Sequence, residues 1–136
     1  MMNVWMQMHD LSHADLPDGS IESATQALGE FDWDSEIQKE EQAAASGSEC
    51  CPPGMGFVCD SGRILHIIPA SGSRSHYHYH YPLTKKLLGF IPVTSQAIVS
   101  VRDVPDAQRP ELIQCHYDQN HNRVLELLHA HGKQWT

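Results

Sequence analysis

The sequence predicts an α+β fold: an acidic helical segment followed by an antiparallel β-meander of five to seven short strands, as an open sheet or a small barrel. Two observations support this prediction. In the first third of the chain, apolar residues recur at the three- and four-residue spacing of a helix. After residue 54, short Val- and Ile-rich runs alternate with Gly- and Pro-containing turns. Such short connections require antiparallel pairing, because parallel strands need long crossovers.

Charge divides the 136-residue chain, which is long enough for one domain with a core. Residues 1–49 hold 11 of the 17 acidic residues and one base, Lys39, for a net charge of −10, whereas residues 50–136 have a net charge of +2. Between them, AAASGSECCPPG has the composition of a linker. We therefore predict an acidic front over 1–49, helical or partly disordered, and a β-rich domain over 50–136.

Two helices are predicted in the front. Ser20 is the predicted cap of the first, and Ser35 with Gln38 three residues later resembles a capping box for the second, which runs to about residue 45. The methionine-rich start, residues 1–13, is predicted to be a frayed terminus. The apolar stripe of the first helix consists of Ile21, Ala24, Leu28 and Phe31.

The body is predicted to be a series of strands, the first two joined by the turn Asp60-Ser61-Gly62. Residues 122–131 are ambiguous. A short polar turn before them favours a returning strand, which is our prediction, but Asn122 as a cap and Gly132 as a stop also fit a helix. The other predicted strands cover residues 56–60, 63–70, 75–82, 87–93, 96–104 and 111–118.

The segment SHYHYHYP, residues 75–82, alternates histidine with tyrosine. In a strand, His76, His78 and His80 share one face at about 3.3 Å per residue, so neighbouring histidines could ligate one ion but the outer two are about 13 Å apart. A metal would therefore need donors from other strands. The predicted ligand set is His66, His78, His80, His116 and Cys59, with Zn as an example of the metal. The interpretation that we favour is simpler: tyrosines that pack and histidines that form a polar face.

Phe31 and Trp33, in LGEFDWDSEI, are the predicted interaction residues. Two large aromatic side chains between acids suit docking into the groove of a partner protein, with Trp33 as the anchor. The alternative is intramolecular, with both rings folded down to cover an open face of the sheet. At positions i and i+2 they would share a face only in extended backbone.

Several function classes are disfavoured by composition. The acidic front and the lack of a dense basic stripe argue against nucleic-acid binding. No run approaches the roughly 20 apolar residues of a membrane helix, and the start does not resemble a secretory signal. We therefore expect a cytoplasmic protein whose four cysteines are thiols. No nucleophile elbow, phosphate-binding glycine loop or H-E-x-x-H motif is present.

We expect a small cytosolic, non-catalytic domain that binds a protein partner through the acidic aromatic front or an open sheet face. The alternative is a transition-metal-binding domain (Zn, Ni, Cu or Fe) built on the His-x-His strand. A metal-dependent hydrolase or oxygenase on the same residues is a third hypothesis. The sequence determines neither the partner, the strand order nor the oligomeric state.

Overall fold

The computed structural model describes residues 1–134 and contains a seven-stranded antiparallel open sheet and four α-helices. The strand order is β2-β1-β3-β4-β5-β6-β7, which confirms the predicted α+β meander. The strands are β1 (Asn3–Gln7), β2 (His13–Asp15), β3 (Gly54–Val58), β4 (Ile64–Ala70), β5 (Arg74–Leu87), β6 (Ile91–Pro105) and β7 (Lys133–Gln134). The helices are α1 (Ile21–Glu30), α2 (Trp33–Ala45), α3 (Arg109–Tyr117) and α4 (His121–His131), with a 3-10 turn at Asp106–Gln108.

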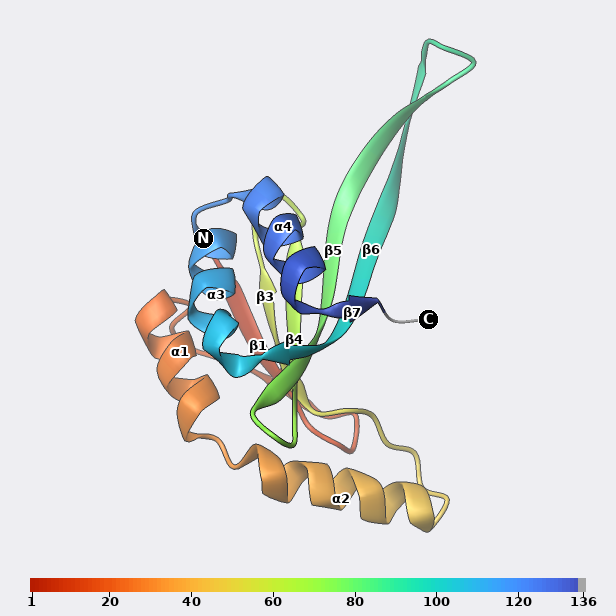
Figure 1. The fold of residues 1–136 in the computed structure, drawn as a ribbon. Coiled ribbons are helices and arrows are strands. Elements are labelled where there is room, and N and C mark those ends of the chain that lie inside the picture. Colours follow the sequence, from red (N-terminus) through yellow and green to blue (C-terminus); the bar gives the residue numbers. More distant parts are fainter. Residues whose placement is uncertain (135–136) are drawn as a thin grey trace.

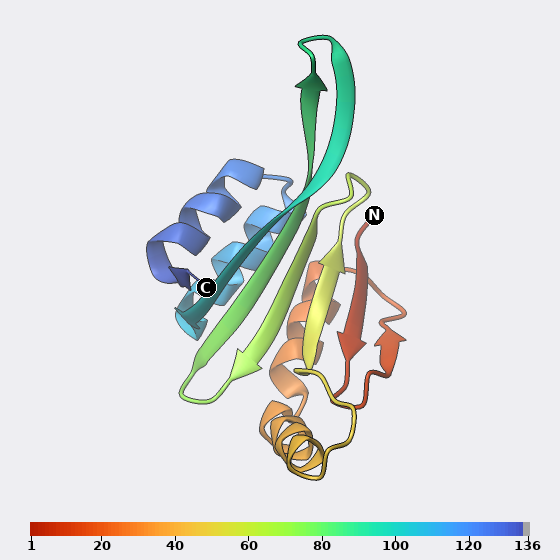
Figure 2. The ribbon, with the colours of Figure 1, turned by 90° about the vertical axis from the view of Figure 1, so that its right-hand side faces the viewer.

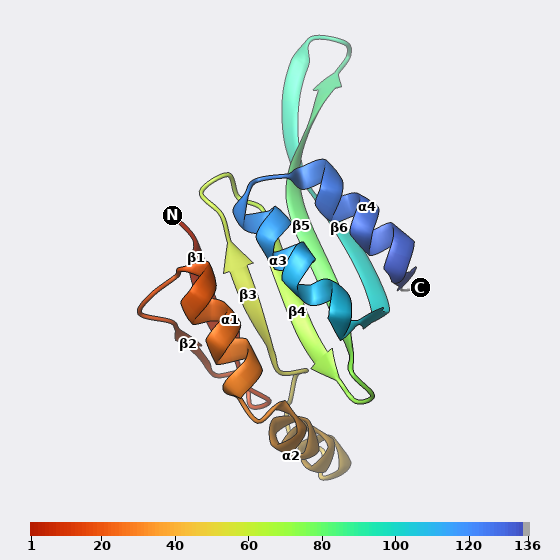
Figure 3. The ribbon, with the colours of Figure 1, turned by 60° about the vertical axis from the view of Figure 1, so that its left-hand side comes forward.

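One face of the sheet is packed against helices and the other is open. Helices α1, α3 and α4 lie over one face (Figure 3), and the strands are in view on the opposite side (Figure 2). Because side chains alternate along a strand, Phe57, Leu65, Tyr77 and Tyr79 point into the core and are fully buried. Helix α2 lies at the lower end of the sheet (Figure 1).

Strands β5 and β6 are much longer than the short strands predicted for this region. Pairing of β5 with β4 ends at His80, and β7 pairs with β6 only near Val101, so residues 82–98 form a two-stranded ribbon, called the arm below. The arm projects beyond the rest of the molecule (Figure 1). The predicted strand 87–93 is wrong at its centre, because Leu88 and Gly89 have positive φ (55° and 84°) and reverse the chain there.

The two C-terminal segments that were predicted as strands are helices. Pro110 lies in the first turn of α3, and burial of Leu112, Ile113 and His116 follows a helical period. In α4, the side chain of Asn120 accepts a hydrogen bond from the Arg123 backbone, and the helix ends before Gly132. Both segments therefore form helices, in agreement with their helical spacing of buried residues. The alternation of side chains between two faces, on which a strand was predicted over 111–118, does not correspond to a strand.

The predicted frayed terminus is also wrong, because β1 is an interior strand between β2 and β3. Val4 is buried in the core, and β1 pairs along its length with β3, which begins beyond the predicted linker.

The two predicted helices of the front are present, the first capped by Ser20 as expected. The second begins earlier than predicted, because Asp32 rather than Ser35 supplies the capping side chain. Among residues 1–134, no helix has the length and apolarity required to cross a membrane.

Candidate functional site

The five predicted metal ligands lie on opposite faces of the sheet. His66 on β4 and His78 and His80 on β5 are partly buried on the open face. Cys59 and His116 are buried together on the other side, where α3 packs. The alternation that places the tyrosines of β5 in the core therefore separates the predicted set into a group of three and a group of two.

The open face carries a row of residues aligned by the strand register. Trp5, Gly56, His66, His78 and Ser100 occupy matching positions on β1, β3, β4, β5 and β6. The Trp5 and His66 ring centroids are 5.3 Å apart, and those of His66 and His78 are 6.0 Å apart. His78 Nδ1 lies 2.8 Å from Ser100 Oγ, within hydrogen-bonding distance. This row, called the histidine row below, joins five neighbouring strands on one face.

Two glycines of β3 make room for the histidine row. A Cβ at Gly56 would overlap the Trp5 indole, and a Cβ at Gly54 would lie 2.9 Å from His66 Nε2. His66 Nε2 is buried and has no hydrogen-bond partner among the described residues. This burial, with smaller contributions from the nearby His78 and His80, lowers the pKa of His66 to about 4. Neutral imidazole is therefore the stable form of His66 at neutral pH.

The histidine row supplies too few ligands for a closed metal site. Burial lowers the pKa of both His78 and His80, which favours the neutral imidazoles that bind metals. However, His66 Nε2 faces the backbone of Gly54, and a structural zinc site needs four ligands. Within residues 1–134, no group of three or more His, Cys, Asp or Glu side chains is placed to hold one ion.

Cys59 and His116, buried together on the helix-covered side of the sheet, have the geometry of a structural contact and not of a catalytic pair. His116 Nε2 lies 2.8 Å from the Phe57 carbonyl oxygen, to which it donates, and 3.3 Å from Cys59 Sγ. Since Nε2 carries the proton in that hydrogen bond, it cannot accept the thiol proton. Burial raises the pKa of the Cys59 thiol and lowers that of His116. The pair therefore consists of a neutral thiol and a neutral imidazole, unlike an activated nucleophile.

The predicted interaction residues lie within the fold. Trp33 is 9% exposed, belongs to the core, and donates a hydrogen bond from Nε1 to the Leu28 carbonyl oxygen at 2.8 Å. Phe31 is partly buried and its ring centroid is 4.5 Å from that of Trp33. Extended backbone at Phe31, the C-cap of α1, brings the two rings together. The structure thus has the intramolecular arrangement that was the alternative to docking.

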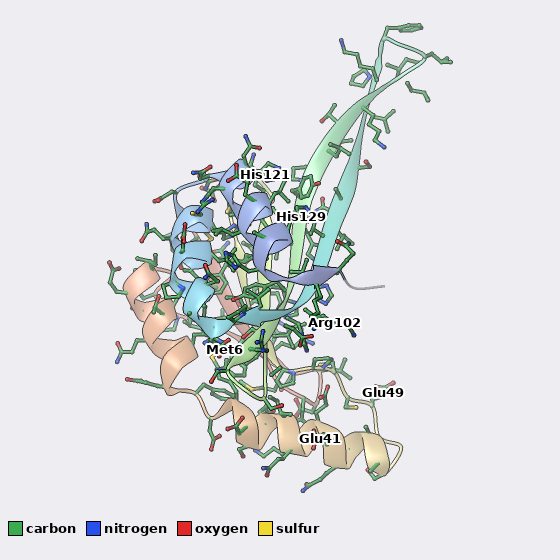
Figure 4. The ribbon with its side chains drawn as sticks, viewed as in Figure 1. Met6, Glu41, Glu49, Arg102, His121 and His129 are labelled. Atoms are coloured by element: carbon green, nitrogen blue, oxygen red, sulfur yellow. The ribbon has the colours of Figure 1, made fainter. Side chains whose placement is uncertain are left out.

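The arm is the functional candidate that the sequence patterns did not identify. Along β5, Tyr77 and Tyr79 are buried beneath the helices, and Tyr81 contacts His121 at the start of α4, with ring centroids 4.6 Å apart. Beyond His121 (labelled in Figure 4), the same face of the ribbon continues without helical cover and carries Leu83, Leu87, Ile91 and Val93.

The tip of the arm is apolar and basic. Leu88 and Phe90 are 77% and 74% exposed, although both are large hydrophobic residues. Lys85 and Lys86 lie just behind them, and no Asp or Glu occurs between Asp60 and Asp103. The run LLGFIPV is apolar in the sequence, but its prediction as a strand did not indicate that Leu88 and Phe90 are exposed on a turn.

Comparisons of the chain with protein-family models, with curated proteins and with solved structures gave no match. Two surfaces of the described residues are thus available for functional contacts. The histidine row is a packed set of neutral side chains, whereas the arm presents large apolar side chains to solvent. Of the two, the arm exposes the side chains that gain most from burial.

Proposed function

We propose that this protein is a small, non-catalytic cytosolic domain that acts through protein–protein contacts, and that the arm is its contact surface. The observation that carries the proposal is the exposure of Leu88 and Phe90 at the end of a projecting ribbon. Exposed apolar side chains gathered on one projection and rimmed by polar residues are typical of binding surfaces. The four free cysteines are compatible with a reducing compartment.

Burial of the apolar side chains of the arm would contribute favourable free energy to a complex. Each fully buried Leu, Ile or Phe side chain contributes about 1.5–3 kcal/mol. Four such side chains, Leu87, Leu88, Phe90 and Ile91, are clustered within five residues of the turn. A two-stranded ribbon is also marginally stable by itself in water. A partner would therefore both bury the tip and stabilise the ribbon that presents it.

Site-specific photo-crosslinking in the cells that produce the protein tests this proposal. A photoreactive residue in place of Leu88 should give a discrete protein adduct, and the additional substitution Phe90→Ser should abolish it. The same photoreactive residue in place of Gln26, an exposed position on α1, is the matched control. Equal adduct yields from positions 88 and 26, or no protein adduct from position 88, would contradict the proposal.

A further inference from the structure

We infer that the partner of the arm is a second copy of this chain, whose pocket between α2 and the end of β4 receives the arm tip. This inference rests on the proposed function of the arm as a contact surface, and names its occupant. The pocket has a volume of about 270 Å³. That size is below the roughly 300–1,000 Å³ typical of small-molecule sites, and suits a few apolar side chains.

The pocket and the arm tip have complementary chemistry. The pocket is lined by the apolar side chains of Ile37, Pro53 and Ile68, together with the partly buried Glu40 and the exposed Glu41 of α2. The arm tip has the matching composition, with apolar side chains at the turn and two lysines behind them. An apolar protrusion flanked by two cations thus corresponds to an apolar recess flanked by two anions.

The charged groups on both surfaces lack internal partners. Within the described residues, neither Lys85 nor Lys86 forms an ion pair, and neither do Glu40 and Glu41; the one ion pair of α2 with a lysine joins Lys39 to Glu36. Opposite charges on two surfaces steer their encounter and fix their orientation. These four side chains are therefore available to orient the arm on the pocket.

The two surfaces of one chain cannot meet each other. His76, which lines the pocket, and Leu87, the last residue of β5, are 11 residues apart on one extended strand, or roughly 36 Å at about 3.3 Å per residue. Glu41 on α2 and the arm lie at opposite ends of the molecule (Figure 4). The contact is therefore intermolecular. The arm tip and the pocket are the same distance apart in every copy. Two antiparallel copies related by a twofold axis can therefore each place an arm tip in the pocket of the other.

The distribution of apolar residues along the arm favours a protein recess over a lipid surface. Leu83, Leu87, Ile91 and Val93 share one face of the ribbon with Lys85, whereas Thr84, Lys86 and Thr94 lie on the other. A recess covers one face of a ribbon, whereas a bilayer surrounds an inserted tip. A lipid surface and an unrelated protein remain outcomes that the experiment distinguishes.

The test is the oligomeric state of the full chain, measured by sedimentation equilibrium, with charge-reversed variants. The native chain should form a dimer, and Phe90→Ser should raise the dimer Kd at least tenfold. The arm variant Lys85→Glu/Lys86→Glu and the pocket variant Glu40→Lys/Glu41→Lys should each be monomeric, because in each variant the two surfaces carry like charges. A mixture of the two variants should form heterodimers, in which each reversed surface meets its complement.

Two controls separate loss of contact from loss of fold. Gln42→Lys, an exposed change on α2 away from the pocket lining, should leave the dimer intact, and all variants should keep the native circular dichroism spectrum. A monomeric native chain at about 100 μM, or a mixture that stays monomeric, would overturn the inference. A monomer that instead binds anionic phosphatidylserine vesicles would also overturn it. If the native chain is monomeric but the photo-crosslink at position 88 captures a different protein, the arm proposal stands and only the second copy is refuted.

Discussion

Replacing His66 by phenylalanine should remove a large part of the acid sensitivity of the fold. Burial, with smaller contributions from His78 and His80, holds the pKa of His66 at about 4 in the folded protein, against 6.5 for an unperturbed histidine. The unfolded chain therefore binds a proton between pH 6.5 and 4 that the folded chain does not. Stability from this residue is fully present above pH 6.5 and is lost as the pH falls towards 4.

The magnitude follows from the difference between the two pKa values. Each pKa unit corresponds to about 1.4 kcal/mol, so the complete loss at acidic pH is about 3 kcal/mol, and at pH 5 it is about 2 kcal/mol. A phenyl ring at position 66 would keep the packing against Trp5 and the space above Gly54, without a titrating group. It would also remove the buried, unpartnered Nε2 atom, so no loss of stability is expected at pH 7.5.

Urea unfolding at pH 7.5 and pH 5.0 measures this effect. The difference in free energy of unfolding between the two pH values should be about 2 kcal/mol smaller in His66→Phe than in the native chain. His129→Gln, at an exposed position on α4, should retain the native difference. If His66→Phe and the native chain lose the same free energy between pH 7.5 and 5.0, the assigned environment of His66 is wrong.

Three further outcomes follow from the packing. Trp33→Ala should destabilise the fold by about 3–5 kcal/mol in urea unfolding, because it empties a core position and removes the hydrogen bond to Leu28; a loss below about 1 kcal/mol would mean that the ring is not buried. Gly56→Ala should cost about 1–3 kcal/mol because its Cβ overlaps the Trp5 indole, and the cost should shrink in a Trp5→Ala background. Equimolar Zn²⁺ should leave the thermal unfolding midpoint of untagged protein within about 1 °C of its metal-free value, since the histidine row lacks a third ligand. A rise of several degrees would show that the row holds enough ligands to bind the ion.

Local patterns in the sequence were sufficient for strands β3 and β4, for the inward and outward alternation of β5, and for the start of α1. The alternation of β5 buries its tyrosines, as the His/Tyr pattern predicted, whereas the β4–β5 register that places His66 opposite His78 is seen only in the structure. Ser20 caps α1 because its hydroxyl reaches the Ser23 backbone nitrogen, a contact within four residues. These features depend on neighbours in the chain, which a single sequence displays directly.

Features that depend on distant residues were not predictable in this way. The sequence around Val4 does not show that β3, some 50 residues later, provides its pairing strand. The helices α3 and α4 are decided by which side chains face the sheet, and residues 111–118 satisfied both periods. The exposure of Leu88 and Phe90 depends on where the helical cover ends, a property of the assembled fold.

The position of β1 has a consequence for the order of folding. Val4 pairs with Phe57, 53 residues away, whereas the β4–β5 hairpin closes between Ala70 and Arg74. Loop closure costs about 0.6 kcal/mol for each doubling of length, so the first pairing carries about 2 kcal/mol more entropic cost than the second. We expect β1 to dock on β3 late in folding, after the β4–β5 hairpin has formed, leaving β3 as a temporary edge. An amino-terminal fusion that slows this docking would prolong the exposure of that edge and favour aggregation.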